Sequence, residues 1–573
     1  MSAIWPERKS RLIVFSVLAG LFVIIALRSL LWSGIMALDP LGAVTSGAQA
    51  SADVFWKLRA PFHPTAMQDK VVVILLNQEQ MPLFEPEIDE AGITRQAAEA
   101  WPPRFFEYAR ILEVVKGPAD ERPRAVFFDL ILDNEHIDDD TLGVLDAALK
   151  QAHADGLPVF LAKVPSRSAG PRSVRTTLET RPGRPLVLDE NQPHIKPLAV
   201  AWDGYGDTYP LAVHSETKEG MKADELLTPA SQLYLSFLES EETPANERRA
   251  RKMRDHIATP REGFPPAMAV AWGMSAGQTP FDQHREGKNP CRPVGPDTLD
   301  RVGLSLRILW SAVGFGPARS LWEVPQPCPF HVSITAEELL SDDFSDQVMV
   351  RQLLDDAIVL IGADVQAIPD RVASPVQGTV PGVFLHAMAL DNLLNFGTAH
   401  YRSPDKIEAD FLPGWMRLSA DRVIEGLLLV VAFAIAAFAE RTGPAAHTFG
   451  GSIRSALRRL AFLAAFLVIV SAVLAWMTMS KNWVPYNWAS ILGISALIFF
   501  VNAQKMSAGF ASSAQRTFAG HPLASGLVLG AIMCLAATVL ILLAPSILLG
   551  AALVLPVLLL LFSLWRREAA ITP

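Results

Sequence analysis

Charged residues and cysteines are scarce in this sequence. Asp, Glu, Lys and Arg make up 19% of the 573 residues, three residues are cysteine, and half of the residues are apolar. The mean hydropathy is +0.25. This composition excludes an ordinary soluble protein and indicates that part of the chain lies in lipid.

Apolar residues gather in six runs, most of them close to the length of about 20 residues that a helix needs to cross a bilayer. The runs are residues 12–32, 422–439, 460–479, 488–501, 523–544 and 546–565. Pro545 divides the last two, which predicts a helical hairpin. Few ionisable residues lie inside the runs, for example Arg28 and Glu425, which argues against an ion-coupled transporter.

Lys and Arg near the ends of the runs predict the orientation of the chain. Residues 1–11, the loops at 440–459 and 502–522, and the tail at 566–573 are basic, so we expect them to face the cytoplasm. Residues 33–421 then lie outside, in the periplasm of a bacterium, and residues 422–565 form a membrane domain of five helices. Residues 12–32 would alternatively be a signal peptide, but SGIMALDPLG is a poor cleavage site and favours an uncleaved anchor.

Two of the cysteines are candidates for a disulfide. Cys291 and Cys328 lie beside prolines in the external segment, whereas Cys534 lies in an apolar run. In an oxidising compartment a bond between the first two would stabilise the fold by about 3–4 kcal/mol. The alternative is two unrelated buried thiols.

Four short apolar runs in the external segment are typical of strands buried in a parallel sheet. They are residues 71–76, 125–130, 158–164 and 357–361. Helical patterns at residues 104–115 and 141–152 lie between them. This alternation predicts an α/β domain, a mostly parallel sheet with flanking helices, beside the α-helical membrane domain of six crossings. Residues 165–283 show no clear period, and we expect insertions and long loops there.

Polar residues follow these predicted strands. Asn77, Asp129, Asp133, Lys163 and Asp364 lie at the strand ends or shortly after them. Ligands of open parallel sheets bind at the carboxyl ends of the strands, so these residues predict a small-molecule pocket. The alternative is that they cap the following helices or bind loop backbone.

Two blocks of the external segment resemble a known family. The first is IVLIGADVQAIPDRVASPVQGTVPGVFLHAMALDNLL at residues 358–394, and the second is AVFFDLILDNEHIDDDTLGVLDAAL at residues 125–149. Both resemble the CHASE2 domain, an extracellular sensory domain of bacterial histidine kinases, cyclases and related receptors. The resemblance implies that Asp129, Asp370 and His386 form the polar signature of the family. It also implies a homodimer, and it names no ligand.

The membrane part departs from the pattern of such receptors. They continue into a catalytic domain after the third of their later crossings, whereas this sequence continues with the hairpin at residues 523–565. The loops at residues 441–459 and 502–522 are too short for a catalytic domain and contain no P-loop, kinase or cyclase signature. We therefore expect no enzyme activity and a separate signalling partner.

Three local features have a functional and a structural interpretation. GMSAG at residues 273–277, with His284 and His331 downstream, matches the sequence of a nucleophile elbow. An elbow needs a strand directly before it, but the preceding PPAMAVAW reads as a helix, which favours a chance match. DNEHIDDD at residues 133–140, with His136, would bind Ca²⁺ or Mg²⁺, or would cap the next helix, which we favour. His386 would be a hydrogen-bonded core residue or a ligand contact.

The sequence thus predicts a multi-pass inner-membrane sensory subunit with both termini in the cytoplasm. It would contact the lipid bilayer, detect a small periplasmic ligand and pass the signal to another protein. We expect no cofactor and no nucleic-acid partner. The alternative is a membrane-assembly or transport subunit that uses its periplasmic domain for docking.

Overall fold

A computed structural model describes residues 52–77, 101–132, 141–163, 225–259, 266–275, 297–313, 329–340, 344–365 and 370–404, together with shorter stretches. The chain divides into two compact units. Unit 1 comprises Met1–Leu58, Ser305–Val324 and Pro404–Arg567, and unit 2 comprises Arg59–Leu304, Pro325–Ser403 and Glu568–Pro573. In unit 1, Ala420, Met477 and Trp483 form a small apolar cluster.

Unit 2 contains a six-stranded parallel sheet in its described part. The order across the sheet is β11 (Val332–Thr335), β1 (Val71–Asn77), β12 (Ile358–Asp364), β4 (Ala125–Asp129), β5 (Val159–Lys163) and β6 (Lys196–Ala199). All five neighbouring pairs are parallel. The four predicted strands are confirmed as β1, β4, β5 and β12. Helices cover both of their faces, which explains why their sequences are continuously apolar instead of alternating.

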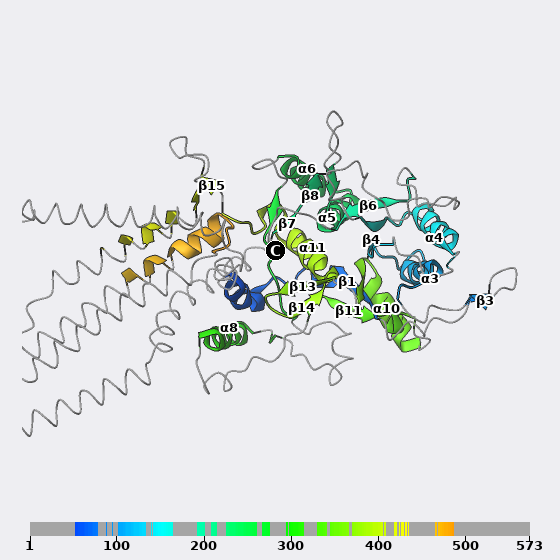
Figure 1. Cartoon of the computed structure of the whole chain (residues 1–573), viewed down its shortest axis with the longest axis horizontal. Coiled ribbons are helices and arrows are strands. Elements are labelled where there is room, and N and C mark those ends of the chain that lie inside the picture. Colours follow the sequence, from blue (N-terminus) through cyan, green and yellow to red (C-terminus); the bar gives the residue numbers. More distant parts are fainter. Residues whose placement is uncertain are drawn as a thin grey trace, which may run out of the picture. The chain divides into compact units, whose positions relative to one another are not determined.

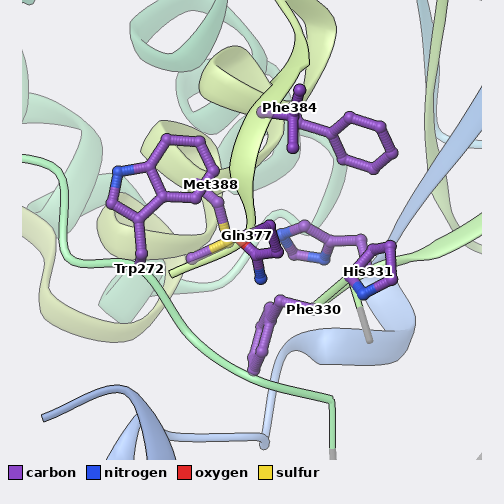
Figure 2. A pocket seen from close by; sticks show the side chains of 8 residues that line it. Trp272, Phe330, His331, Gln377, Phe384 and Met388 are labelled. Carbon is purple, nitrogen blue, oxygen red and sulfur yellow. The ribbon is translucent and has the colours of Figure 1, made fainter. Parts of the chain in front are cut away.

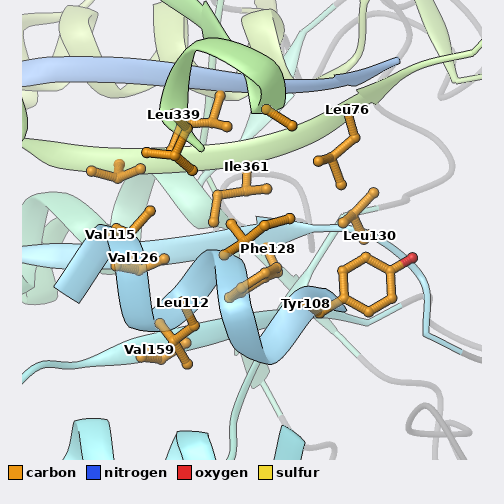
Figure 3. Packing of buried hydrophobic residues seen from close by; sticks show 14 of the residues in the cluster. Leu76, Tyr108, Leu112, Val115, Val126, Phe128, Leu130, Val159, Leu339 and Ile361 are labelled. Atoms are coloured by element: carbon orange, nitrogen blue, oxygen red, sulfur yellow. The ribbon is translucent and has the colours of Figure 1, made fainter. Parts of the chain in front are cut away.

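Helices on one face of the sheet form the main core. They are α3 (Phe105–Lys116), α4 (Leu142–Ala154), α9 (Ala336–Leu339) and α10 (Phe344–Leu354). Figure 3 shows side chains of α3, among them Tyr108 and Leu112, packed against Val126 and Phe128 of β4. The predicted helices at residues 104–115 and 141–152 are α3 and α4, so this layer of the α/β fold followed from the sequence.

The other face of the sheet is covered by α5 (Pro229–Ser240) and α11 (Val383–Phe396), which pack on each other (Figure 1). A further helix, α6 (Pro244–Ile257), packs on α5. The prediction of only insertions and loops at residues 165–283 was therefore wrong. The helix α6 lacks a visible apolar pattern because only a narrow stripe is buried, formed by Asn246, Ala250, Met253 and Ile257.

The described residues between β12 and α11 include a hairpin. Strands β13 (Arg371–Ser374) and β14 (Gly378–Pro381) pair antiparallel. The helix α11 then crosses β12 closely at Gly362, because a Cβ atom there would lie 2.6 Å from Cβ of Val383. Only glycine allows this approach, which fixes the start of α11 against the carboxyl end of β12.

No helix in the described part of the chain is both long and apolar enough to cross a membrane. The predicted crossings at residues 12–32, 488–501, 523–544 and 546–565 lie outside the described residues. Those at residues 422–439 and 460–479 are described only in part. The six crossings and their orientation stay predictions.

Candidate functional site

The parallel register brings several predicted polar residues to one edge of the sheet. Asp129 is the last residue of β4 and lies opposite Gly362 of β12. Asn77 ends β1 opposite Asp364, the last residue of β12. The carboxyl ends of β1, β12 and β4 are thus adjacent, as expected for the ligand-binding edge of an open parallel sheet.

Asp129 is the most unusual of these residues. Its side chain is 7% exposed, and its Oδ2 atom is buried without a hydrogen-bond partner in the described structure. Burial raises the pKa of Asp129 well above its usual range, and the nearby charge of Asp370 raises it further. Burial also raises the pKa of Asp370. Two carboxyl groups are therefore placed where neither ionises easily.

The position of Asp370 depends on the glycine that precedes α11. The backbone N–H of Gly382 donates to the carbonyl oxygen of Asp370 over 3.0 Å. A Cβ atom on Gly382 would overlap the carboxylate of Asp370. The P-G-V sequence before the helix therefore leaves room for the second carboxyl group of the pair.

His386 of α11 lies against Asp129, with 3.6 Å between His386 Nε2 and Asp129 Oδ1. Its Nδ1 lies 2.8 Å from the hydroxyl oxygen of Tyr209, which also accepts the backbone N–H of Ala230. The Tyr209 hydroxyl is thus bonded to both Ala230 and His386, and it holds the ring with Nε2 toward Asp129. Burial lowers the pKa of His386 to about 3, so the ring is neutral.

The structure thus assembles the three residues that the resemblance had singled out, Asp129, Asp370 and His386. It adds Tyr209 of β7 (Tyr209–Pro210), which the sequence analysis missed. No sequence signal identifies Tyr209, because it lies in the stretch without a clear period, 177 residues from its partner His386.

Among the other predicted site residues that the structure describes, Asn77 and Asp364 form no hydrogen bond or ion pair with this group in the described part of the chain. Asp364 forms an ion pair with Arg371 instead. Asn77 has a buried Oδ1 atom without a hydrogen-bond partner in the described structure, and Lys163 is buried at the end of β5. Asp133, Cys291 and Cys328 lie outside the described residues, so their predicted roles stay predictions.

A small cavity lies on another side of α11 (Figure 2). Phe384 and Met388 of α11 line it together with Trp272, Pro329, Phe330, His331, Gln377 and Val380. Its volume is about 20 Å³, which is room for one water molecule. The cavity as it stands is therefore too small for a metabolite, and we do not assign the ligand site to it.

The GMSAG motif does not form the local structure of a nucleophile elbow. The residues before it were predicted to be helical, but Ala267–Met268 form strand β10 and residues 269–275 are neither helix nor strand. Ser275 lies seven residues beyond the end of β10 and accepts a hydrogen bond from Gln68 Nε2 at 3.3 Å. An elbow needs the strand directly before its serine.

The described end of the acidic loop at residues 133–140 has a capping role. Asp139 accepts the backbone N–H of Phe105 at 2.7 Å and that of Thr141 at 2.9 Å. It thus caps both α3 and the start of α4. The sequence had predicted a cap for the next helix, α4, but not for α3. Among the described residues, no group of three or more His, Cys, Asp or Glu side chains is arranged to hold a metal ion.

Comparison with known proteins identifies the family. A family model of the CHASE2 domain matches residues 22–436. No curated protein and no solved structure matches the chain. CHASE2 domains are typically periplasmic sensory domains of membrane proteins. Since the match covers well over half of the chain and includes both blocks that suggested the resemblance, the chain belongs to the CHASE2 domain family.

Proposed function

We propose that this chain is a multi-pass inner-membrane sensory subunit whose CHASE2 domain binds a small, positively charged periplasmic ligand at Asp129 and Asp370. His386 and Tyr209 position the site. The bound state is passed to a separate signalling protein.

One observation carries the proposal, namely that the buried Oδ2 atom of Asp129 has no hydrogen-bond partner among the described residues and lies near a second carboxyl group. A buried unpaired polar atom costs folding free energy, on the order of 1–3 kcal/mol. Strongly perturbed carboxyl groups of this kind gather at functional sites. A cation would supply the missing partner and remove the repulsion between the two carboxylates.

The elements that carry the site residues explain how binding would be signalled. His386 belongs to α11, and Asp370 directly precedes the hairpin β13–β14. Because Asp129 is almost fully buried and His386 of α11 lies against it, a ligand enters only if the elements that cover Asp129 move. Binding is thereby linked to a displacement of these elements.

The site is tested by the thermal stability of the full-length protein in mild detergent during titration with methylamine, putrescine and Ca²⁺. We expect at least one of these cations to stabilise the wild type, and D129N and D370N to lose that stabilisation. The matched control is D155N, which changes an ion-paired aspartate at the end of α4 and should respond like the wild type. Equal responses of the wild type and D129N, or no response to any cation, would contradict the proposed site.

The membrane arrangement and the partner rest on the sequence. Six apolar runs with basic flanks support a multi-pass protein, and the short loops at residues 441–459 and 502–522 support an output supplied by another protein. Crosslinking at these loops followed by mass spectrometry tests the second point. A kinase, cyclase or phosphatase at the crosslinks supports the sensory subunit, whereas envelope-assembly or transport proteins there would favour the docking alternative.

A further inference from the structure

A second group of buried polar residues includes a side chain of α11 that lies five residues after His386. It consists of Arg59, His63, Asp391 and Tyr401, which we call the clamp. Each of the four is at most 3% exposed. The clamp contains no member of the predicted ligand site, although Asp391 lies in the block at residues 358–394 that resembles the family.

The contacts in the clamp form one continuous chain. Arg59 Nε donates to the Tyr401 hydroxyl at 3.2 Å, and Arg59 Nη1 lies 3.2 Å from His63 Nδ1. His63 Nε2 lies 2.5 Å from Asp391 Oδ2. The guanidinium of Arg59 also lies over the Tyr401 ring, 4.7 Å from its centroid.

These contacts fix the protonation of His63. Arginine is always a donor, so Nδ1 of His63 must accept and carries no proton. The ring proton is therefore on Nε2, which donates to Asp391. A neutral imidazole thus connects one positive charge, Arg59, with one negative charge, Asp391. Asp391 Oδ2 also accepts a hydrogen bond from Asn395 Nδ2 at 3.1 Å, so the carboxylate is held from its own helix as well.

The clamp lies at two of the places where the chain passes between the units. The chain passes from unit 1 to unit 2 between Leu58 and Arg59, and from unit 2 to unit 1 between Ser403 and Pro404; it also crosses at residues 304/305, 324/325 and 567/568. Arg59 is the first residue after one passage, and Tyr401 lies two residues before the other. The clamp fastens both segments to Asp391 and therefore to α11.

The same helix connects the clamp with the carboxylate site. His386 and Asp391 are five residues apart on α11, about 7.5 Å along the helix axis. An α-helix of this length moves as a rigid element, because its backbone hydrogen bonds join successive turns. A displacement at His386 is therefore transmitted to Asp391.

We infer that the clamp makes the two connecting segments, residues 59–63 and 397–403, open and close together under the control of α11. In the proposed sensor this joint opening is the output of the domain. Only this last point rests on the proposed function, since the joint opening of the two segments is a property of the clamp itself.

The test is amide hydrogen exchange of the full-length protein in detergent, without any ligand. D391N keeps the shape of the side chain but removes the charge that balances Arg59. We expect exchange in residues 59–63 and 397–403 to accelerate together, by at least roughly tenfold, which corresponds to the loss of one hydrogen bond to a charged group. The strands β1 and β4 should keep their protection, and D155N should change neither segment.

Acceleration of only one segment, or the same acceleration in D155N, would overturn the inference. If D391N loses the protection of the sheet as well, the milder Y401F decides the question. It removes the hydroxyl that accepts from Arg59 but keeps the ring, so it should accelerate both segments by a smaller, common factor. Unchanged exchange of both segments in Y401F, or a change in one alone, would overturn the inference.

D129N separates the clamp from the proposed function. A change in exchange at residues 59–63 and 397–403 in D129N shows that the carboxylate site and the clamp are coupled. If D391N opens both segments and D129N leaves them unchanged, the clamp stands while the route from the carboxylate site fails.

Discussion

Replacing Asp129 by asparagine should stabilise the protein at neutral pH. The substitution keeps the shape of the side chain and removes an ionisable group whose Oδ2 atom is buried without a hydrogen-bond partner in the described structure. It also removes the repulsion from Asp370, whose charge raises the pKa of Asp129. The side-chain amide introduced by D129N stays neutral at every pH.

The magnitude follows from the cost of a buried polar atom without a partner, about 1–3 kcal/mol. For a domain of this size, each kcal/mol shifts Tm by about 2 °C, so D129N should raise Tm by roughly 2–6 °C. The sign depends on pH. A carboxyl group whose pKa is raised in the folded state binds its proton more tightly there, so it favours folding in acid and this contribution is lost as pH rises through the folded pKa. The advantage of D129N should therefore be greatest at pH 7–8 and should disappear toward the unfolded pKa of about 4.

The assay is thermal unfolding of the full-length wild type and D129N in detergent at several pH values between about 4 and 8. The matched control is D155N. Hydrogen bonds from Lys116 and Gln151 lower the pKa of Asp155, so its removal should lower Tm at neutral pH instead of raising it. The reasoning would be refuted if D129N lowered Tm at neutral pH, or if its effect did not decrease toward acid pH.

Three further outcomes are expected. Y209F should destabilise the domain by about 1–2 kcal/mol, because it removes the hydroxyl that bonds to His386 and to backbone, and chemical denaturation of the detergent-solubilised protein checks this. G362A should lower Tm or abolish folding, because its Cβ atom would overlap Val383, whereas G143A has open space around its Cβ and should leave Tm unchanged or slightly raised. Burial lowers the pKa of three histidines in the described part of the domain. These are His63, His331 and His386. Each should reduce stability by up to about 1.4 kcal/mol per pH unit below the unfolded pKa of about 6.5, since the unfolded state binds the additional proton. Melting curves between about pH 7.5 and 5.5 check the slope, which H386Q should reduce by one proton, and an unchanged slope in H386Q would contradict the assignment.

The sequence by itself determined the α/β architecture and the family. Strands buried on both faces require continuous apolar runs, so β1, β4, β5 and β12 were visible without a structure. Helix α3 was visible because it presents a broad apolar stripe, and α4 was visible because its sequence, LGVLDAALKQAHA, is rich in Leu and Ala. Asp129, Asp370 and His386 were identified by motif, and the structure places them together.

Short or weakly patterned elements could not be predicted. The edge strand β6 has the sequence KPLA, which is too short to show a period and contains a proline, and β11 is VSIT. The helix α6 buries only a narrow stripe among charged residues. The burial of these elements comes from their neighbours in the fold, and their own composition does not reveal it.

Only the tertiary structure decided which polar groups meet. Tyr209 reaches His386 across 177 residues of sequence, and Arg59 reaches Tyr401 across 342. A single sequence contains no signal for such pairs, because each residue type also occurs on exposed surfaces. Their chemistry arises when packing removes water from them, since a desolvated charge needs a partner and a desolvated carboxyl group without one holds its proton.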